Sequence, residues 1–67
     1  MIKREYFVVI FDTEAHGIRS IEARCDSEAN AKLFMEENAY LIKDLNKPYP
    51  FSWFEFRINE VVVMEGE

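Results

Sequence analysis

The chain has 67 residues, which allows one domain (1–67) with a small core, because so short a chain buries only roughly 60% of its unfolded surface. Its 13 acidic and 8 basic residues give a net charge of −5, which argues against direct binding to nucleic acid or anionic membrane, since both need Lys and Arg to neutralise phosphate. Cys25 is the only cysteine and His16 the only histidine, so an intrachain disulfide is excluded and no metal site is expected.

The first two predicted elements are strands joined by a tight turn. Residues 2–11 are rich in β-branched and aromatic side chains, and the stretch YFVVIF (6–11) is apolar on both faces. The stretch DTEAHG forms the turn, in which Gly17 supplies backbone freedom. Residues 18–25 form the second strand, and their alternation places Ile21, Ala23 and Cys25 on one face.

A helix and a third strand follow. Asp26 or Ser27 caps the helix, apolar residues recur at helical spacing as far as Leu45, and the prolines of NKPYP end it near residues 44–46. Residues 53–64 alternate as a strand until the stretch NEVVV, where the phase changes and predicts a β-bulge at Asn59 or Glu60.

The element order ββαβ predicts an α+β fold. The hairpin brings the first two strands together, and the helix returns the chain so that the third strand lies beside the first. We therefore expect a three-stranded antiparallel sheet in the order 2-1-3, with one helix packed on one face.

One helix covers only one face of such a sheet, so one apolar set of the central first strand stays open. The sequence does not distinguish which set this is, Tyr6, Val8 and Ile10 or Phe7, Val9 and Phe11. An exposed apolar patch on a small protein typically marks a contact surface. We assign Tyr6, Val8 and Ile10 to the open face and expect a dimer or partner to cover it. A symmetric dimer is the commonest way to cover such a face.

The alternative is a monomer that covers this face itself. The segment 46–52, with the aromatic residues Tyr49, Phe51 and Trp53 in or beside it, would then fold over the open side of the sheet.

Acidic side chains form a second candidate surface. In the expected topology, the hairpin turn and the C-terminal half of the helix lie at the same end of the sheet. Glu37 and Asp44 are seven residues apart on one helix face, ~10 Å along its axis, and carboxylates so spaced imitate the charge rows of DNA. An ordinary solvated helix face is the alternative. The candidate partner-binding residues are Asp12, Glu14, Glu36, Glu37 and Asp44.

Catalytic chemistry is not expected. Cys25 and His16 lie at opposite ends of the second strand, about 30 Å apart, which is too far for a nucleophile and its base. With two glycines the chain has no phosphate-binding loop, and no cofactor is expected. No apolar run approaches the ~18 residues of a membrane-spanning helix, and no signal peptide is recognised, so we expect a cytoplasmic location.

The stretches FDTEAH and FMEENAYLIKDL, together with small size and acidity, resemble the small acidic host-takeover proteins of lytic bacteriophages that act as DNA mimics. The resemblance implies an inhibitor that occupies the basic DNA-binding surface of a host protein, such as the nucleoid protein HU. We expect this inhibitor to be a homodimer and to act in the host cytoplasm. The alternative function is a small homodimeric interaction module that uses its apolar open face, with acidity serving solubility.

Overall fold

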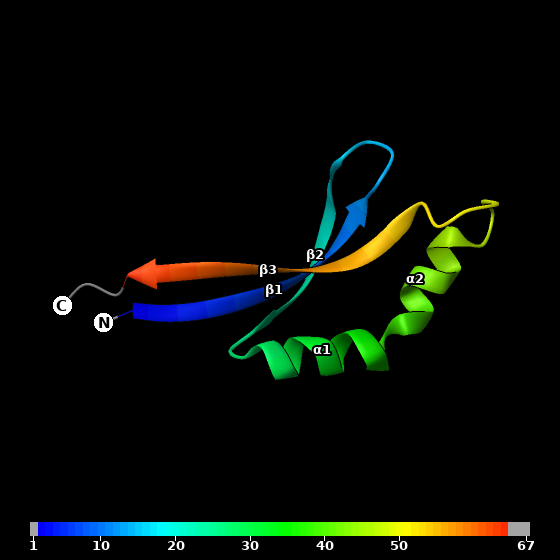
Figure 1. Ribbon diagram of the computed structural model, residues 1–67. Coiled ribbons are helices and arrows are strands. Elements are labelled where there is room, and N and C mark those ends of the chain that lie inside the picture. Colours follow the sequence, from blue (N-terminus) through cyan, green and yellow to red (C-terminus); the bar gives the residue numbers. More distant parts are fainter. Residues whose placement is uncertain (1, 65–67) are drawn as a thin grey trace.

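The computed structural model describes residues 2–64, which form one three-stranded sheet and two short helices (Figure 1). The sheet is antiparallel with the strand order β2-β1-β3, which confirms the predicted α+β class and topology. The prediction of one helix is wrong, because the helical region divides into two. The elements in chain order are β1 (Ile2–Asp12), β2 (Gly17–Cys25), α1 (Glu28–Glu37), α2 (Ala39–Asn46) and β3 (Phe54–Met64).

Asn38 divides the helical region. Its backbone, at φ −116° and ψ 23°, is not helical. Both its backbone N–H and its side-chain amide donate to the carbonyl oxygen of Phe34, at 3.0 and 2.9 Å. The side chain thus adds a second donor to a carbonyl near the end of α1, a local bond that asparagine commonly makes at helix ends. At the other end of α1 the predicted cap is confirmed, because the Ser27 hydroxyl accepts from the N–H of Asn30.

The β-bulges lie in β2 and not in β3. Strand β3 pairs with β1 without interruption from Met64 opposite Ile2 to Phe54 opposite Asp12, so the bulge predicted at Asn59 or Glu60 is absent. The pairing of β1 with β2 shifts twice, leaving Glu22 and Arg19 as extra residues.

The apolar stretch Val61–Val63 loses its alternation because of its position. There β1 and β3 extend beyond β2, whose pairing with β1 begins at Tyr6. The two strands project as a ribbon, at the left of Figure 1, that neither helix covers. With no face buried, nothing selects alternation of apolar and polar residues.

The hairpin turn is held by Asp12 and Thr13. One carboxylate oxygen of Asp12 accepts from the backbone N–H groups of Glu14 and Ala15, at 3.0 and 2.9 Å, which is an Asx-type turn. The backbone N–H and the hydroxyl of Thr13 both donate to the carbonyl of Trp53. Within the turn the left-handed position belongs to His16, with φ 57°, whereas Gly17 has no positive φ.

The helices cover the face of β1 that carries Tyr6, Val8 and Ile10. Ile10 lies opposite Phe56 in the sheet, and the Phe56 ring meets the Phe34 ring of α1 edge-on at 6.4 Å between centroids. Val8 and Ile10 are 0% and 3% exposed. The assignment of Tyr6, Val8 and Ile10 to an open dimer or partner face is therefore wrong, because α1 packs on that side.

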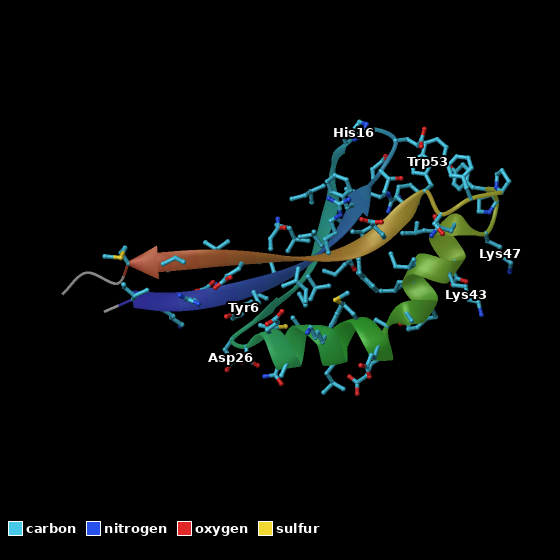
Figure 2. All side chains as sticks on the ribbon, in the orientation of Figure 1. Tyr6, His16, Asp26, Lys43, Lys47 and Trp53 are labelled. Atoms are coloured by element: carbon cyan, nitrogen blue, oxygen red, sulfur yellow. The ribbon has the colours of Figure 1, made fainter. Side chains whose placement is uncertain are left out.

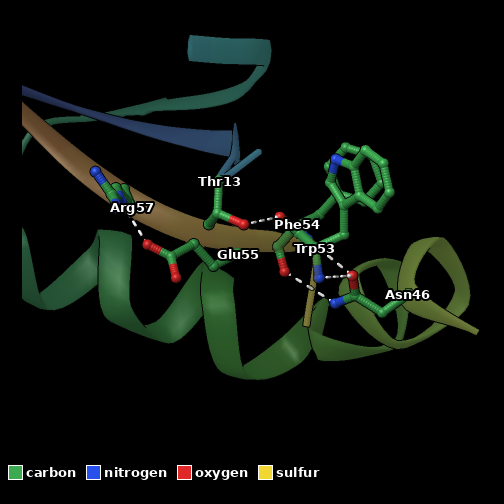
Figure 3. Close-up of polar contacts among 6 residues, drawn as sticks. All are labelled: Thr13, Asn46, Trp53, Phe54, Glu55 and Arg57. Atoms are coloured by element: carbon green, nitrogen blue, oxygen red, sulfur yellow. Dashed lines mark hydrogen bonds and ion pairs between the residues drawn. The ribbon is translucent and has the colours of Figure 1, made fainter. Parts of the chain in front are cut away.

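Asn46, the last residue of α2, joins the helical layer to the sheet (Figure 3). Its side-chain oxygen accepts from the backbone N–H groups of Trp53 and Phe54, each at 2.8 Å. Its amide nitrogen donates to the carbonyl of Phe54, also at 2.8 Å. These three bonds give α2 a fixed position at the start of β3.

Replacing Asn46 with alanine should destabilise the fold. Three hydrogen bonds are lost and partly buried backbone groups are left without partners, so we expect a decrease of about 2–3 kcal/mol in the free energy of unfolding. Urea denaturation followed by circular dichroism measures the change. The matched control is Asn59→Ala, since Asn59 is exposed. Equal stability of the two variants would contradict the role given to Asn46.

Candidate functional site

The candidate site is the face of the sheet opposite the helices, here called the open face. At its centre, β1 places Phe7, Val9 and Phe11 side by side. Strand β2 adds Ile21 opposite Val9 and Ile18 opposite Phe11. Ile18 and Ile21 are 50% and 63% exposed. Two large aliphatic side chains thus stand in solvent beside half-buried aromatic rings, which is typical of a contact surface.

The two bulges of β2 put Ile18 and Ile21 on this face. Simple alternation predicts Ile21 on the same side as Ala23, but the extra residue Glu22 lies between them. Because a shift of one residue moves a side chain to the other face of a sheet, Ile21 joins the open face while Ala23 stays opposite Val8 beneath the helix.

Strand β3 supplies the polar border of the open face. Arg57 lies opposite Val9, and its guanidinium carbon is 3.6 Å from the centroid of the Phe11 ring, in cation–π contact. Glu55 forms an ion pair with Arg57 (Figure 3). This cover leaves Val9 only 1% exposed. The open face therefore has a mainly apolar half on β1 and β2, with Arg24 at its border opposite Phe7, and a polar half on β3.

The segment 46–52 does not fold over the open face. Its aromatic side chains gather with Trp53 at the end of the sheet, where Trp53 lies beside the C-terminal turn of α2 (Figure 2). The ring centroids of Tyr49 and Trp53 are 4.4 Å apart, and Phe51 stacks on Trp53 at 5.8 Å. This cluster leaves Ile18 and Ile21 uncovered.

Asp12, the first of the five predicted contact acids, is used inside the fold. In addition to the two turn hydrogen bonds, its carboxylate accepts from the indole N–H of Trp53 at 2.7 Å. The bond from the Ala15 N–H is the main cause that lowers the pKa of Asp12. The bonds from Trp53 and Glu14 and the charge of Arg19 add to this effect, and partial desolvation opposes it. Asp12 therefore orders the turn through one carboxylate oxygen, Oδ1, which accepts all three hydrogen bonds.

The other four acids are exposed but do not form one row. Glu14 lies in the hairpin turn, Glu36 and Glu37 end α1, and Asp44 lies on α2. The break at Asn38 turns α2 away from the axis of α1, so the straight spacing predicted for Glu37 and Asp44 is lost (Figure 1). The turn and the end of α1 lie on opposite sides of the sheet in this view.

The exposed acids do have uncompensated charge. Within residues 2–64, Arg or Lys side chains form ion pairs with four other acids, namely Glu5, Glu28, Glu55 and Glu60. None of the pairs involves Glu14, Glu36, Glu37 or Asp44. These four carboxylates are therefore free to meet a basic surface.

The described part of the chain brings no catalytic or metal-binding group of side chains together. His16 lies in the hairpin turn and Cys25 at the far end of β2. Residues 2–64 contain no group of three or more His, Cys, Asp or Glu side chains that could hold a metal ion. They also contain no helix of the length and apolar character needed to cross a membrane.

Comparisons of the chain with protein-family models, with curated proteins and with solved structures find no match. We therefore infer the function from the geometry of these surfaces.

Replacing Asp12 with asparagine should change how stability depends on pH. Because the pKa of Asp12 is lowered in the folded state, its ionised form stabilises the fold above the ordinary carboxyl pKa, and this contribution is lost as the pH falls below about 4. The difference in unfolding free energy between wild type and Asp12→Asn should thus be larger near neutrality than in acid, as measured by urea denaturation.

The control for this comparison is Glu14→Gln. Glu14 lies in the same turn, and its side chain makes no hydrogen bond within residues 2–64. A stability difference for Asp12→Asn that does not change with pH would contradict the account of the turn.

Proposed function

We propose that this chain is a non-catalytic protein-interaction module that forms a homodimer through the open face of its sheet. The observation that carries the proposal is the exposure of Ile18 and Ile21 beside Phe7 and Phe11. Burying these side chains between two copies would remove apolar surface from water at roughly 25 cal/mol per Å². A domain of this size has a small core and benefits most from such added burial.

A second copy suits the layout of the open face. A two-fold axis through the apolar half would place β1 and β2 of one copy on the same strands of the other. The polar half on β3, with Glu55, Arg57 and Asn59, would then lie at the edge of the contact. An apolar centre with a polar rim is the usual arrangement of protein interfaces.

Replacing Ile21 with aspartate should abolish the dimer. A carboxylate at the centre of the contact would be buried without a partner, which is strongly unfavourable. Sedimentation equilibrium at high micromolar concentration measures the mass. We expect wild type at twice the chain mass of 8.0 kDa and the variant at the monomer mass.

The control variant is Leu33→Asp. Leu33 is 50% exposed, but it lies on α1 and away from the open face, so this variant should remain dimeric. Circular dichroism checks that both variants are folded. A monomeric wild type, or equal loss of the dimer in both variants, would contradict the proposal.

A second candidate function is inhibition of a basic DNA-binding protein, such as HU in the cytoplasm of a phage-infected bacterium. The observation that favours it is the set of exposed carboxylates without ion-pair partners, Glu14, Glu36, Glu37 and Asp44. In this proposal they take the place of DNA phosphates on the partner's basic surface. A dimer would double the number of charges presented.

Reversing the charge of Glu36 and Glu37 should weaken such inhibition. Displacement of a fluorescent DNA duplex from purified HU measures it. We expect the double change Glu36→Lys, Glu37→Lys to reduce the apparent affinity about tenfold, and wild-type affinity to fall steeply with added salt.

The control with the same net charge is Glu28→Lys, Glu60→Lys, which changes acids that already have basic partners. Displacement that does not respond to salt, or that responds equally to both double variants, would exclude charge mimicry by Glu36 and Glu37.

A further inference from the structure

A groove beside α2 carries positive charge on an otherwise acidic protein. Its volume is about 710 Å³, and its lining includes Ala39, Ile42 and Ser52 together with Lys43 and Lys47. The two lysines lie one helical turn apart, so their side chains share one face of α2. Figure 2 shows both extending from the same side of the helix, next to the loop that leads to Trp53.

The lysines of the groove are not neutralised within the described chain. Arg4, Arg24, Lys32 and Arg57 each form an ion pair with an acid among residues 2–64, whereas Lys43 and Lys47 form none. Asp44 also lines the groove, so the local balance is two positive charges against one negative charge. This sign is opposite to the net charge of −5 of the whole chain.

Two stacked aromatic residues, Phe51 and Trp53, flank Ser52, which lines the groove. Phe51 is 49% exposed, and its ring lies nearly parallel to that of Trp53, at an angle of 11°. Trp53 is itself fixed, because its indole N–H donates to Asp12 and its backbone N–H to Asn46. The Phe51 ring stacks on this fixed Trp53 ring. Its exposed side can therefore contact a ligand with little further loss of conformational freedom.

We propose that this groove binds an acidic peptide segment of a partner protein that also carries an apolar side chain. Carboxylates of the segment would pair with Lys43 and Lys47, and the apolar side chain would lie on Ile42 and against Phe51. Paired charges beside an apolar contact are a common form of peptide recognition. The groove belongs to the helical layer, on the other side of the sheet from the open face, so a dimer leaves it accessible.

Single-stranded nucleic acid offers the same two features, phosphate charge and stacking bases. The net charge of −5 disfavours it, because a polyanion would meet repulsion from the rest of the molecule. A short peptide segment with only a few carboxylates carries less total charge than a polynucleotide, meets less of this repulsion and is the better match.

Fluorescence anisotropy tests the proposal. The probe is a short fluorescein-labelled synthetic peptide composed of aspartate, glutamate, phenylalanine and leucine, titrated with the wild-type chain at low salt. We expect saturable binding that the double change Lys43→Glu, Lys47→Glu weakens about tenfold or more. The variant Phe51→Ala should weaken it through the apolar contact alone.

A matched control has the same net charge as the groove variant. The double change Lys3→Glu, Lys32→Glu leaves the groove intact and should bind the peptide within about twofold of wild type. Absence of binding by wild type, or equal weakening by both double variants, would overturn the proposal. Tighter binding of a labelled oligothymidylate than of the peptide would also overturn it and assign the groove to nucleic acid.

Discussion

The packing of α1 against one face of the sheet determines the rest of the structure. Between residues 2 and 64 the buried apolar side chains are Val8, Val9, Ile10, Ala31 and Phe54, and β1 and β3 supply four of them. The helices reach only the side that carries Val8 and Ile10. On the other side Val9 depends for cover on its neighbours in the sheet and on Arg57. A single helical layer thus gives a small core and leaves an apolar surface exposed.

The sequence was sufficient to predict the sheet and its order, because β-branched runs, turn residues and prolines mark where each element begins and ends. It was not sufficient to predict three details that depend on single backbone positions. Asn38 interrupts a helical pattern that apolar spacing alone continues, and its side chain bonds the Phe34 carbonyl at the break. Glu22 shifts the register of β2 and moves Ile21 to the open face. His16 takes the left-handed position next to a glycine that could equally have held it.

The same details explain why the candidate site differed from expectation. The five acids were identified by type and approximate location, but the break at Asn38 removed their common row and the turn engaged Asp12. Both sets of apolar residues on β1 were recognised, but the assignment of Tyr6, Val8 and Ile10 to the open face was wrong. The stretch YFVVIF is equally apolar on its two faces and gives no basis for choosing the covered set. The net charge of the whole chain also gave no sign of the local positive charge of Lys43 and Lys47. These lysines form a distinct surface only when α2 and the loop to Trp53 are placed together.

The central claim is that the open face packs on a second copy, and isotope-filtered NMR measures this contact directly. In a mixture of labelled and unlabelled chains, nuclear Overhauser effects between copies report only intermolecular contacts. The account predicts such effects from the methyl groups of Ile18 and Ile21 to the rings of Phe7 and Phe11. Intermolecular effects confined to the helices or to the projecting ends of β1 and β3, or none at all at millimolar concentration, would contradict it.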